Sequence, residues 1–491
     1  MGLASELESS LRALTATATV EVRDSSGRGI PFSNLSWEVR GAAEKPLLHL
    51  WSENYNLTRR VLAITDRSEQ RLALAVERFG RTKPDRLEFV RVEFQRSTRE
   101  LTREEFAARL TRILAEQFPD EELESLTISP DLQHSLSGNY ARGILRRGSL
   151  CWALLAVPHG ESADAIDNSL TFGLLWLERA RHSARAKNVV GLKLVLPKGS
   201  GRTSAHRSRA LRTDTPVQLY ELDTATEILK ELDPAAGNVD TWLVPHRQTE
   251  SLLARARPSL EPILALSPKN LTLHPSPQSE EVWVRFRGLP VAFWDDGGIH
   301  FGIADPREPL TAISLPRLQA LLTDLELHRH PLATDTRHPL YRAQPERWLQ
   351  AILCQDITLT DAALDPRFVY SQVFANSGCG HGIVDLLGIT RVGRLAILEL
   401  KASEHIHLPL QAADYWLRVR RHLEDGHFSR AGYFPGLELQ SAPPLVYLVA
   451  PALRFHPATD TLLRYLLPQI EITRVGLAET WRRNISVVMR E

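Results

Sequence analysis

Apolar and polar positions alternate with a period of two along residues 1–97, as they do in strands that bury one face. The clearest runs are VEVRD, LSWEVR, LLHLW, RRVLAIT, RLALAVERFG and LEFVRVEF. The pattern therefore predicts a β-rich N-terminal domain over this stretch.

The period changes near residue 98. In REEFAARLTRILAEQF the spacing places Phe106, Leu110 and Ile113 on one helical face. Two strands (ARGILRRG and CWALLAVP), a helix (SLTFGLLWLERARHSA), a strand (GLKLVLP), a basic helix and a strand (VQLYELD) follow. Alternation of this kind is typical of α/β layers, so residues 98–235 are predicted to form an α/β domain.

Residues 236–338 are rich in proline and contain the strand-like runs EVWVRFRGLPVAFW and HFGIA before a helix, PRLQALLTDLELH. We interpret them as a connecting α+β module. From Pro345 the order is again helix, two strands, helix, strand, helix and strand. This predicts a second α/β domain over residues 339–491.

The two α/β stretches agree in more than the order of their elements. ALLAVPHGE aligns with AILELKASE without a gap, and LTFGLLWLERAR aligns with LQAADYWLRVRR after a three-residue shift. We expect an internal duplication. The alternative is that two α/β units of a common type look alike by chance.

The composition is that of a globular protein without an overall field for nucleic acid. The 491 residues carry 59 basic and 59 acidic side chains, so a nucleic-acid partner would need local patches. The three cysteines form no CxxC pair, which argues against a zinc site. No apolar run is long enough to cross a membrane and the N-terminus does not resemble a signal peptide, so we expect a cytoplasmic protein.

Candidate chemistry lies in GIVDLLGITRVGRLAILELKA, where Asp385 is followed by Glu399 and Lys401. Residues two apart on a strand share a face, and a turn near residues 391–394 would bring Asp385 beside Glu399. The two carboxylates and the Leu400 carbonyl make an all-oxygen site for Mg²⁺ or Mn²⁺. Such an ion can polarise a phosphodiester and activate water, and Lys401 would orient that water and support the developing charge.

The surrounding run AILELKA is apolar and predicts a buried strand, where Glu399 and Lys401 would be costly unless they were paired or functional. A structural ion pair between these two side chains is the alternative.

This arrangement resembles the PD-(D/E)XK nuclease superfamily, which has the restriction-endonuclease-like fold, and within it the RecB-type branch. The resemblance covers roughly residues 340–490. It rests on Glu346 in the first helix, on Asp385, on the ELK triplet and on Gln411 and Tyr415 in QAADY. It implies a mixed sheet flanked by helices, a metal role for Glu346, and contacts of Gln411 and Tyr415 with the substrate. The proline of the family name is absent, because Val384 precedes Asp385.

Two of these assignments have plain alternatives. An acidic residue after Pro345 also suits the first turn of a helix, which would explain Glu346 without catalysis. Tyr415 could equally belong to the core.

Neighbouring histidines and arginines add candidates. His381 lies among glycines that would let the backbone approach a phosphate, and Arg418 follows Tyr415 on the same helix, so both are expected to contact substrate. His405 and His407 could bind a transition metal, although we favour polar loop positions at the mouth of the site.

The first α/β stretch lacks this chemistry. The alignment puts Arg142, Ala156 and Pro158 at the positions of Asp385, Glu399 and Lys401, and it puts Thr171 and Leu175 at those of Gln411 and Tyr415. The basic helix GRTSAHRSRALR offers arginines, among them Arg207 and Arg209, either to phosphates or simply to solvent.

These observations predict a divalent-metal-dependent nuclease that hydrolyses phosphodiester bonds, in DNA rather than RNA, with repair or defence as the expected setting. A degenerate nuclease-like domain and a β-rich module would accompany the catalytic domain. The alternative is a non-cleaving nucleic-acid-binding component of a larger assembly that uses the same fold as a scaffold. Cutting both strands with one active copy per chain would require a homodimer, a partner protein or two successive events.

Overall fold

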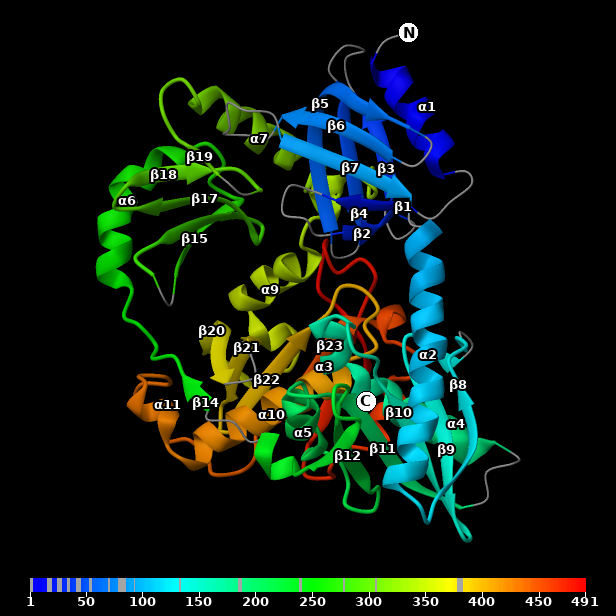
Figure 1. Ribbon diagram of the computed structural model, residues 1–491. Coiled ribbons are helices and arrows are strands. Elements are labelled where there is room, and N and C mark those ends of the chain that lie inside the picture. The colour runs from blue at the N-terminus through cyan, green and yellow to red at the C-terminus, as the bar shows by residue number, and fades with distance from the viewer. Residues whose placement is uncertain are drawn as a thin grey trace. The chain divides into compact units, whose positions relative to one another are not determined.

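The structure is a computed structural model of the whole chain. It describes residues 3–15, 20–23, 29–32, 36–40, 46–52, 55–68, 71–77, 85–91, 93–131, 134–183, 188–237, 241–276, 279–304, 307–377 and 383–491. The chain forms two compact units, each built from two separate stretches (Figure 1). Unit 1 comprises residues 1–102 and 249–344, and unit 2 comprises residues 103–248 and 345–491. The unit boundaries thus lie at Arg103, Thr249 and Pro345, somewhat later than the predicted 98, 236 and 339.

The first stretch of unit 1 is a seven-stranded antiparallel sheet in the order β2-β1-β7-β6-β5-β4-β3. Its strands are β1 (Val20–Arg23), β2 (Gly29–Pro31), β3 (Ser36–Arg40), β4 (Leu47–Ser52), β5 (Tyr55–Arg67), β6 (Arg71–Glu77) and β7 (Asp85–Arg91). Helix α1 (Leu3–Thr15) buries Leu7 and Leu11 against the strands, which completes one hydrophobic core.

The second stretch of unit 1 is a five-stranded antiparallel sheet flanked by helices. The strands run in sequence order and are β15 (Leu271–Pro275), β16 (Val282–Phe286), β17 (Leu289–Asp295), β18 (Gly298–Phe301) and β19 (Glu308–Pro309). Alternate residues of β16 are buried, as the period of two predicts, and they pack with α6 (Glu250–Leu264) and α7 (Leu315–His328). A short helix, α8 (Pro339–Arg342), follows.

The first half of unit 2, residues 103–237, contains a six-stranded sheet in the order β13-β12-β11-β10-β9-β8. Its strands are β8 (Glu122–Thr127), β9 (Ala141–Arg147), β10 (Leu150–Ala156), β11 (Val189–Pro197), β12 (Val217–Asp223) and β13 (Ile228–Leu232). Its helices are the part of α2 (Glu93–Gln117) that follows residue 102, α3 (Ala163–Asp167), α4 (Ser169–His182), α5 (Arg202–Ser208) and the 3₁₀ turn η3 (Pro234–Gly237). Apolar residues of α2 cover one face of the sheet, and α4 covers the other.

The second half of unit 2, residues 345–491, supplies six strands of a seven-stranded sheet in the order β14-β20-β21-β22-β23-β24-β25, and β14 comes from the end of the first stretch of the unit. The strands are β14 (Thr241–Leu243), β20 (Leu364–Ser377), β21 (Ile383–Thr390), β22 (Leu395–Leu400), β23 (Leu445–Pro451), β24 (Ile472–Leu477) and β25 (Val487–Arg490). The helices are α9 (Pro345–Gln355), α10 (Leu408–Glu424), α11 (His427–Arg430) and α12 (Thr459–Arg464), with 3₁₀ turns η4 (Ile357–Leu359) and η5 (Ala452–Arg454). Because β14 pairs with β20, the first stretch of unit 2 extends past residue 236, where the connecting module was predicted to begin.

The two sheets of unit 2 share one connectivity. In each, three strands are joined antiparallel, the next two pairings are parallel, and the last pairing is antiparallel. The correspondence runs from β8 to β13 in the first half and from β20 to β25 in the second. The predicted mixed α/β class is therefore confirmed.

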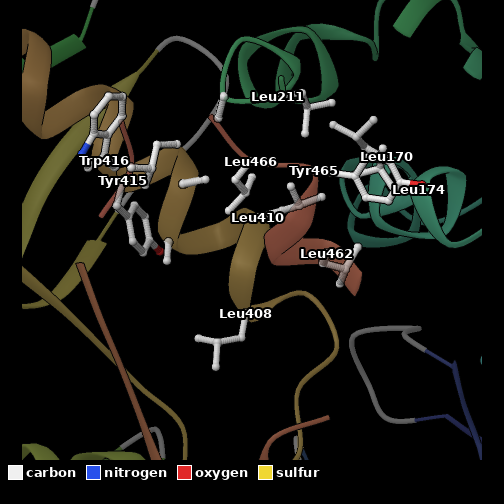
Figure 2. Packing of buried hydrophobic residues seen from close by; sticks show 14 of the residues in the cluster. Leu170, Leu174, Leu211, Leu408, Leu410, Tyr415, Trp416, Leu462, Tyr465 and Leu466 are labelled. Atoms are coloured by element: carbon white, nitrogen blue, oxygen red, sulfur yellow. The ribbon is translucent and has the colours of Figure 1, made fainter. Parts of the chain in front are cut away.

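A single hydrophobic core joins the two halves of unit 2. Figure 2 shows Leu170 of α4 beside Tyr465, with Leu410 of α10 and Leu466 nearby. The segments that follow α5 and α12 also pair with each other through an antiparallel bridge between Leu211 and Leu466. Within the described part of the chain, no helix combines the length and the hydropathy that crossing a bilayer requires.

Candidate active site

The hairpin of β21 and β22 brings Asp385 next to the ELK triplet. Its turn lies at residues 391–393, as predicted, and Gly393 adopts a positive φ of 90° there. The last residue pair of the β21–β22 ladder is Leu386 with Leu398. Beyond this pair, Oδ2 of Asp385 accepts the Leu400 N–H at 2.9 Å. A side-chain carboxylate thus takes the place of a backbone acceptor at the end of the ladder.

Glu399 is the most deeply buried acid of the site, with 1% of the residue exposed. Its Oε1 accepts a hydrogen bond from Lys401 Nζ at 2.8 Å. Its Oε2 is buried and finds no hydrogen-bond partner among the described residues. A purely structural ion pair would be expected to satisfy both oxygens, because a buried carboxylate atom without a partner is costly. The Glu399–Lys401 pair therefore exists but leaves one oxygen available.

The electrostatics of the three groups are coupled. Burial raises the pKa of Glu399 to about 8, and the neighbouring Asp385 adds to the effect. Burial also raises the pKa of Asp385, against the attraction of Lys401. For Lys401, burial alone would lower the pKa, but the Glu399 and Asp385 carboxylates outweigh it and raise the pKa. The site is thus a compact group of charges in which Lys401 faces the Glu399 and Asp385 carboxylates and Arg347 also lowers the pKa of Asp385.

Helix α9 closes one side of this group. Oε1 of Glu346 accepts the Ala402 N–H at 3.2 Å, just after Lys401. Nε2 of the buried Gln350 donates to the Asp385 carbonyl at 2.8 Å. The sequence analysis did not single out Gln350. Its signal was present, because it lies four residues after Glu346 and therefore on the same helical face.

Helix α10 supplies the two predicted polar residues. Nε2 of Gln411 donates to the Tyr415 hydroxyl at 3.1 Å. Tyr415 is 8% exposed and contributes to the core, yet the Glu399 carboxylate is close enough to reinforce the effect of burial and raise its pKa. The tyrosine therefore serves as core and also lies at the edge of the acidic group.

Arg418 lies in a different environment from the one expected. It is 6% exposed, and its Nε donates to Asp414 at 2.6 Å. The structure thus places this guanidinium in a buried ion pair rather than on a surface that a phosphate could reach. His381 lies outside the described residues.

His405 and His407 lie on the loop between β22 and α10. Nδ1 of His407 lies 3.0 Å from the Thr171 hydroxyl in the first half of unit 2. Burial lowers the pKa of His405 to about 4 and that of His407 to about 3, so both rings are neutral near pH 7. Their contacts fit a structural role in this loop.

The described strands β9 and β10 of the first half of unit 2 have no acids at the positions of Asp385 and Glu399, and the strand register corrects the alignment of β10 by one residue. The Lys401 N–H donates to the Val449 carbonyl, and the Val157 N–H donates in the same way to Val195. Leu155 and Val157, which face the shared core, are therefore the equivalents of Glu399 and Lys401. Ala156 faces the opposite core, because a shift of one residue reverses the face of a strand.

Arg142 remains the equivalent of Asp385, since it pairs with Leu155. It is buried and donates to the Ser129 carbonyl. The first half therefore presents an arginine and two apolar side chains where the second half presents two acids and a lysine.

The donor set suits a hard divalent cation. Carboxylate and carbonyl oxygens are the ligands that Mg²⁺ prefers, and the free Oε2 of Glu399 is such a donor. The Leu400 N–H faces β21. Because the carbonyl of a strand residue points to the same side as its N–H, the Leu400 carbonyl also faces β21, on the side of Asp385. Among the residues that the structure describes, no three His, Cys, Asp or Glu side chains form a ready metal cluster. The oxygens at hand for a cation are those of Asp385, Glu399 and the Leu400 carbonyl, and Glu346, whose Oε1 accepts the Ala402 N–H, lies close enough to act on the pKa of Asp385.

A search of protein-family models and of curated proteins finds no match to this chain. Function must accordingly be argued from the site itself.

Proposed function

We propose that the chain is a divalent-metal-dependent nuclease that hydrolyses phosphodiester bonds in DNA. The observation that carries the proposal is the buried Oε2 of Glu399, which has no partner in the described structure although it lies in a group with Asp385 and Lys401. Burial of an unpartnered carboxylate oxygen is costly, and groups with strongly shifted pKa values gather at functional sites, so a bound ion is the use that we assign to it.

Each residue then has a definite task. Asp385, Glu399 and the Leu400 carbonyl would hold Mg²⁺ or Mn²⁺, and the ion would supply Lewis-acid polarisation of the phosphate. The Lys401 ammonium, held against Glu399 at 2.8 Å, would place a positive charge beside the phosphate oxygens and orient the attacking water. Gln411 and Tyr415 would contact the backbone of the substrate, while Gln350 and Glu346 fix the strand ends that present the acids.

We also propose that unit 2 is a duplicated restriction-endonuclease-like domain of the PD-(D/E)XK type, with a degenerate first copy. The shared strand order and strand directions support this. So does the contact between equivalent segments, in which the Arg212 N–H donates to Tyr465 and the Leu467 N–H donates to Ala210. Reciprocal pairing of equivalent segments is what a twofold-related pair of domains would make.

The test is cleavage of circular and linear, single- and double-stranded DNA by the purified full chain with Mg²⁺, Mn²⁺ or EDTA. RNA of the same sequence serves as a competing substrate. Glu399→Ala and Lys401→Ala should abolish metal-dependent cleavage. Glu424→Ala, which removes an exposed acid of α10 that pairs with Arg420, should not.

Binding of DNA without cleavage in any of the metals, by wild type and variants alike, would contradict the nuclease. It would instead favour a scaffold within a larger assembly.

A further inference from the structure

The segment that leads from the catalytic strand to α10 is held by the first half of unit 2. Nδ1 of His407 lies 3.0 Å from the hydroxyl of Thr171 on α4. The ring of Phe172, the next residue of α4, meets the His407 ring edge-on at 5.3 Å between centroids. The start of α10 is thus fixed by side chains more than two hundred positions earlier in the chain.

A second and stronger contact lies further along α10. The side chain of Asp414 is 6% exposed and faces two guanidinium groups and one imidazole ring. Nε of Arg418 lies 2.6 Å from its Oδ1, Nε of Arg207 lies 3.3 Å from its Oδ2, and Nε2 of His206 lies 3.3 Å from its Oδ1. Although burial opposes it, these neighbours hold the pKa of Asp414 below its usual range. Two of these three groups, Arg207 and His206, come from α5 in the first half.

Arg207 connects this carboxylate to the body of the first half. Its Nη1 donates to the Asp167 carbonyl at 2.8 Å and to the Asn168 side chain at 3.2 Å, where α3 passes into α4. One guanidinium therefore joins α10 to the start of the same helix, α4, that carries Thr171. The planar fork of arginine suits such simultaneous contacts, which a lysine could not reproduce.

The position of Asp414 gives this contact a consequence for the site. Tyr415 is the next residue, and Gln411 precedes Asp414 by three positions, so all three lie within about one helical turn. On the other side, the loop that contains His407 begins directly after Lys401. A displacement of α10 would therefore move the substrate-contacting residues and pull on the catalytic lysine.

We propose that the first half of unit 2 is a clamp that positions the β22–α10 segment, with Arg207 as its central positioning residue. The inference rests on the proposed nuclease function for its effect on catalysis. The degenerate half is then retained for the placement of its neighbour, and its basic helix serves this purpose at Arg207 rather than as a phosphate contact.

Arg209 offers a matched control. It lies directly after α5, two residues beyond Arg207, and is exposed, whereas the Arg207 side chain is 12% exposed. Replacing either residue by methionine removes the same charge from the same part of the chain. Only the change at Arg207 should release α10.

The first experiment compares amide hydrogen exchange in the full chain carrying Arg207→Met or Arg209→Met. With Arg207→Met, exchange over residues 402–418 should accelerate by roughly tenfold or more, while strands β22 and β23 stay protected. With Arg209→Met, exchange should match wild type. Equal exchange of this segment in both variants would overturn the clamp, and this readout does not require the protein to cleave anything.

The second experiment measures cleavage. Arg207→Met should lower kcat by roughly 10- to 100-fold with little change in KM, because misplacement of reacting groups acts mainly on turnover. In a Gln411→Ala background, the further loss of kcat from Arg207→Met should be clearly smaller. The displacement of Gln411 can no longer contribute to the loss, because its side chain has already been removed. General destabilisation would instead cost the same factor in both backgrounds.

A rise in KM that Arg207→Met and Arg209→Met share, and that is largest at low salt and shrinks as salt is added, would identify a phosphate-binding helix and contradict the clamp. Wild-type cleavage and its loss in Glu399→Ala report on the proposed function itself, so the two ideas can fail separately.

Discussion

Asp385 accepts the Leu400 N–H at 2.9 Å, and by this bond one side chain both ends the β21–β22 ladder and holds the end of β22. The bond uses Oδ2 alone. The same carboxylate therefore carries a structural task and a chemical one, and substitutions can separate them.

Asp385→Asn should keep the structural task, because the amide oxygen can still accept the Leu400 N–H. It should remove the charge that a cation needs, so metal-dependent cleavage should fall by at least about 100-fold while the melting temperature stays near that of wild type. Asp385→Leu should in addition lower the free energy of unfolding by about 1–3 kcal/mol, since it leaves a buried N–H without an acceptor. Thermal unfolding of the two variants side by side checks this. Equal destabilisation by both would contradict the separation of roles.

Glu399→Gln should stabilise the metal-free protein at alkaline pH. The pKa of Glu399 is raised from 4.5 to about 8, so the folded state binds more protons than the unfolded state between these values, and stability falls as pH rises through that window. Glutamine removes this loss. In denaturant titrations, the free energy of unfolding of the variant relative to that of wild type should rise by at least about 1 kcal/mol from pH 4.5 to pH 8. Outside this window the difference should stay constant. Added Mg²⁺ should stabilise wild type and not the variant; a flat difference across pH would refute this account.

The burial of His422 leads us to expect that the protein loses stability in acid. It is fully buried, its Nδ1 lies 2.8 Å from Nδ1 of His427, and burial lowers its pKa from 6.5 to about 4. Between pH 6.5 and 4, His422 is protonated in the unfolded state but stays neutral in the folded state. The free energy of unfolding should therefore fall by up to about 3 kcal/mol as the pH drops from 6.5 to 4. His422→Leu should flatten this slope. His159→Leu, at an exposed position, should leave it unchanged.

Lys193 and Lys401 are both buried in unit 2, and their replacement by methionine should have opposite results. Lys193 Nζ lies 2.6 Å from both carboxylate oxygens of Glu121 and 3.9 Å from the centre of the Phe118 ring. Lys193→Met should therefore lower the free energy of unfolding by about 3 kcal/mol, because Glu121 loses its partner. At a temperature where the variant is folded, its kcat should match wild type.

Lys401→Met should give the reverse, with cleavage lost and stability nearly kept, because Glu399 can take up a proton when its partner is removed. Calorimetry and a cleavage assay on both variants make the comparison. A loss of kcat in the folded Lys193→Met variant would contradict this expectation, because it would show that Lys193 in the first half is needed for cleavage.

Local pattern accounts for most of what the sequence could predict. Strand period placed Glu399 and Lys401 on one face, and helical spacing put Gln411 beside Tyr415; the structure has both arrangements. The same reasoning could not reach contacts between distant segments. Asp414 lies four positions before Arg418, so their ion pair was within reach of helical spacing. That the pair is buried was not, because Arg207, which also contacts Asp414, lies 207 positions earlier.

The register error in the first half has a related cause. Leu155 and Ala156 are both apolar, and they face different hydrophobic cores. A gapless sequence alignment cannot tell which of the two corresponds to Glu399, because either residue matches the apolar pattern. Only the pairing partners on neighbouring strands decide it. The two-part composition of each unit was likewise hidden, because no local signal shows that β14 joins a sheet formed more than a hundred residues later.

The bridge between Leu211 and Leu466 has a consequence for the products of the reaction. Two identical subunits meeting in this way would carry two sets of acids and could break both strands of a duplex in one encounter. In a single chain the two partners are free to diverge, and under the duplication that we propose the first half would have lost its acids while keeping the contact. Each encounter with a circular duplex should thus release one nicked circle before any linear form accumulates.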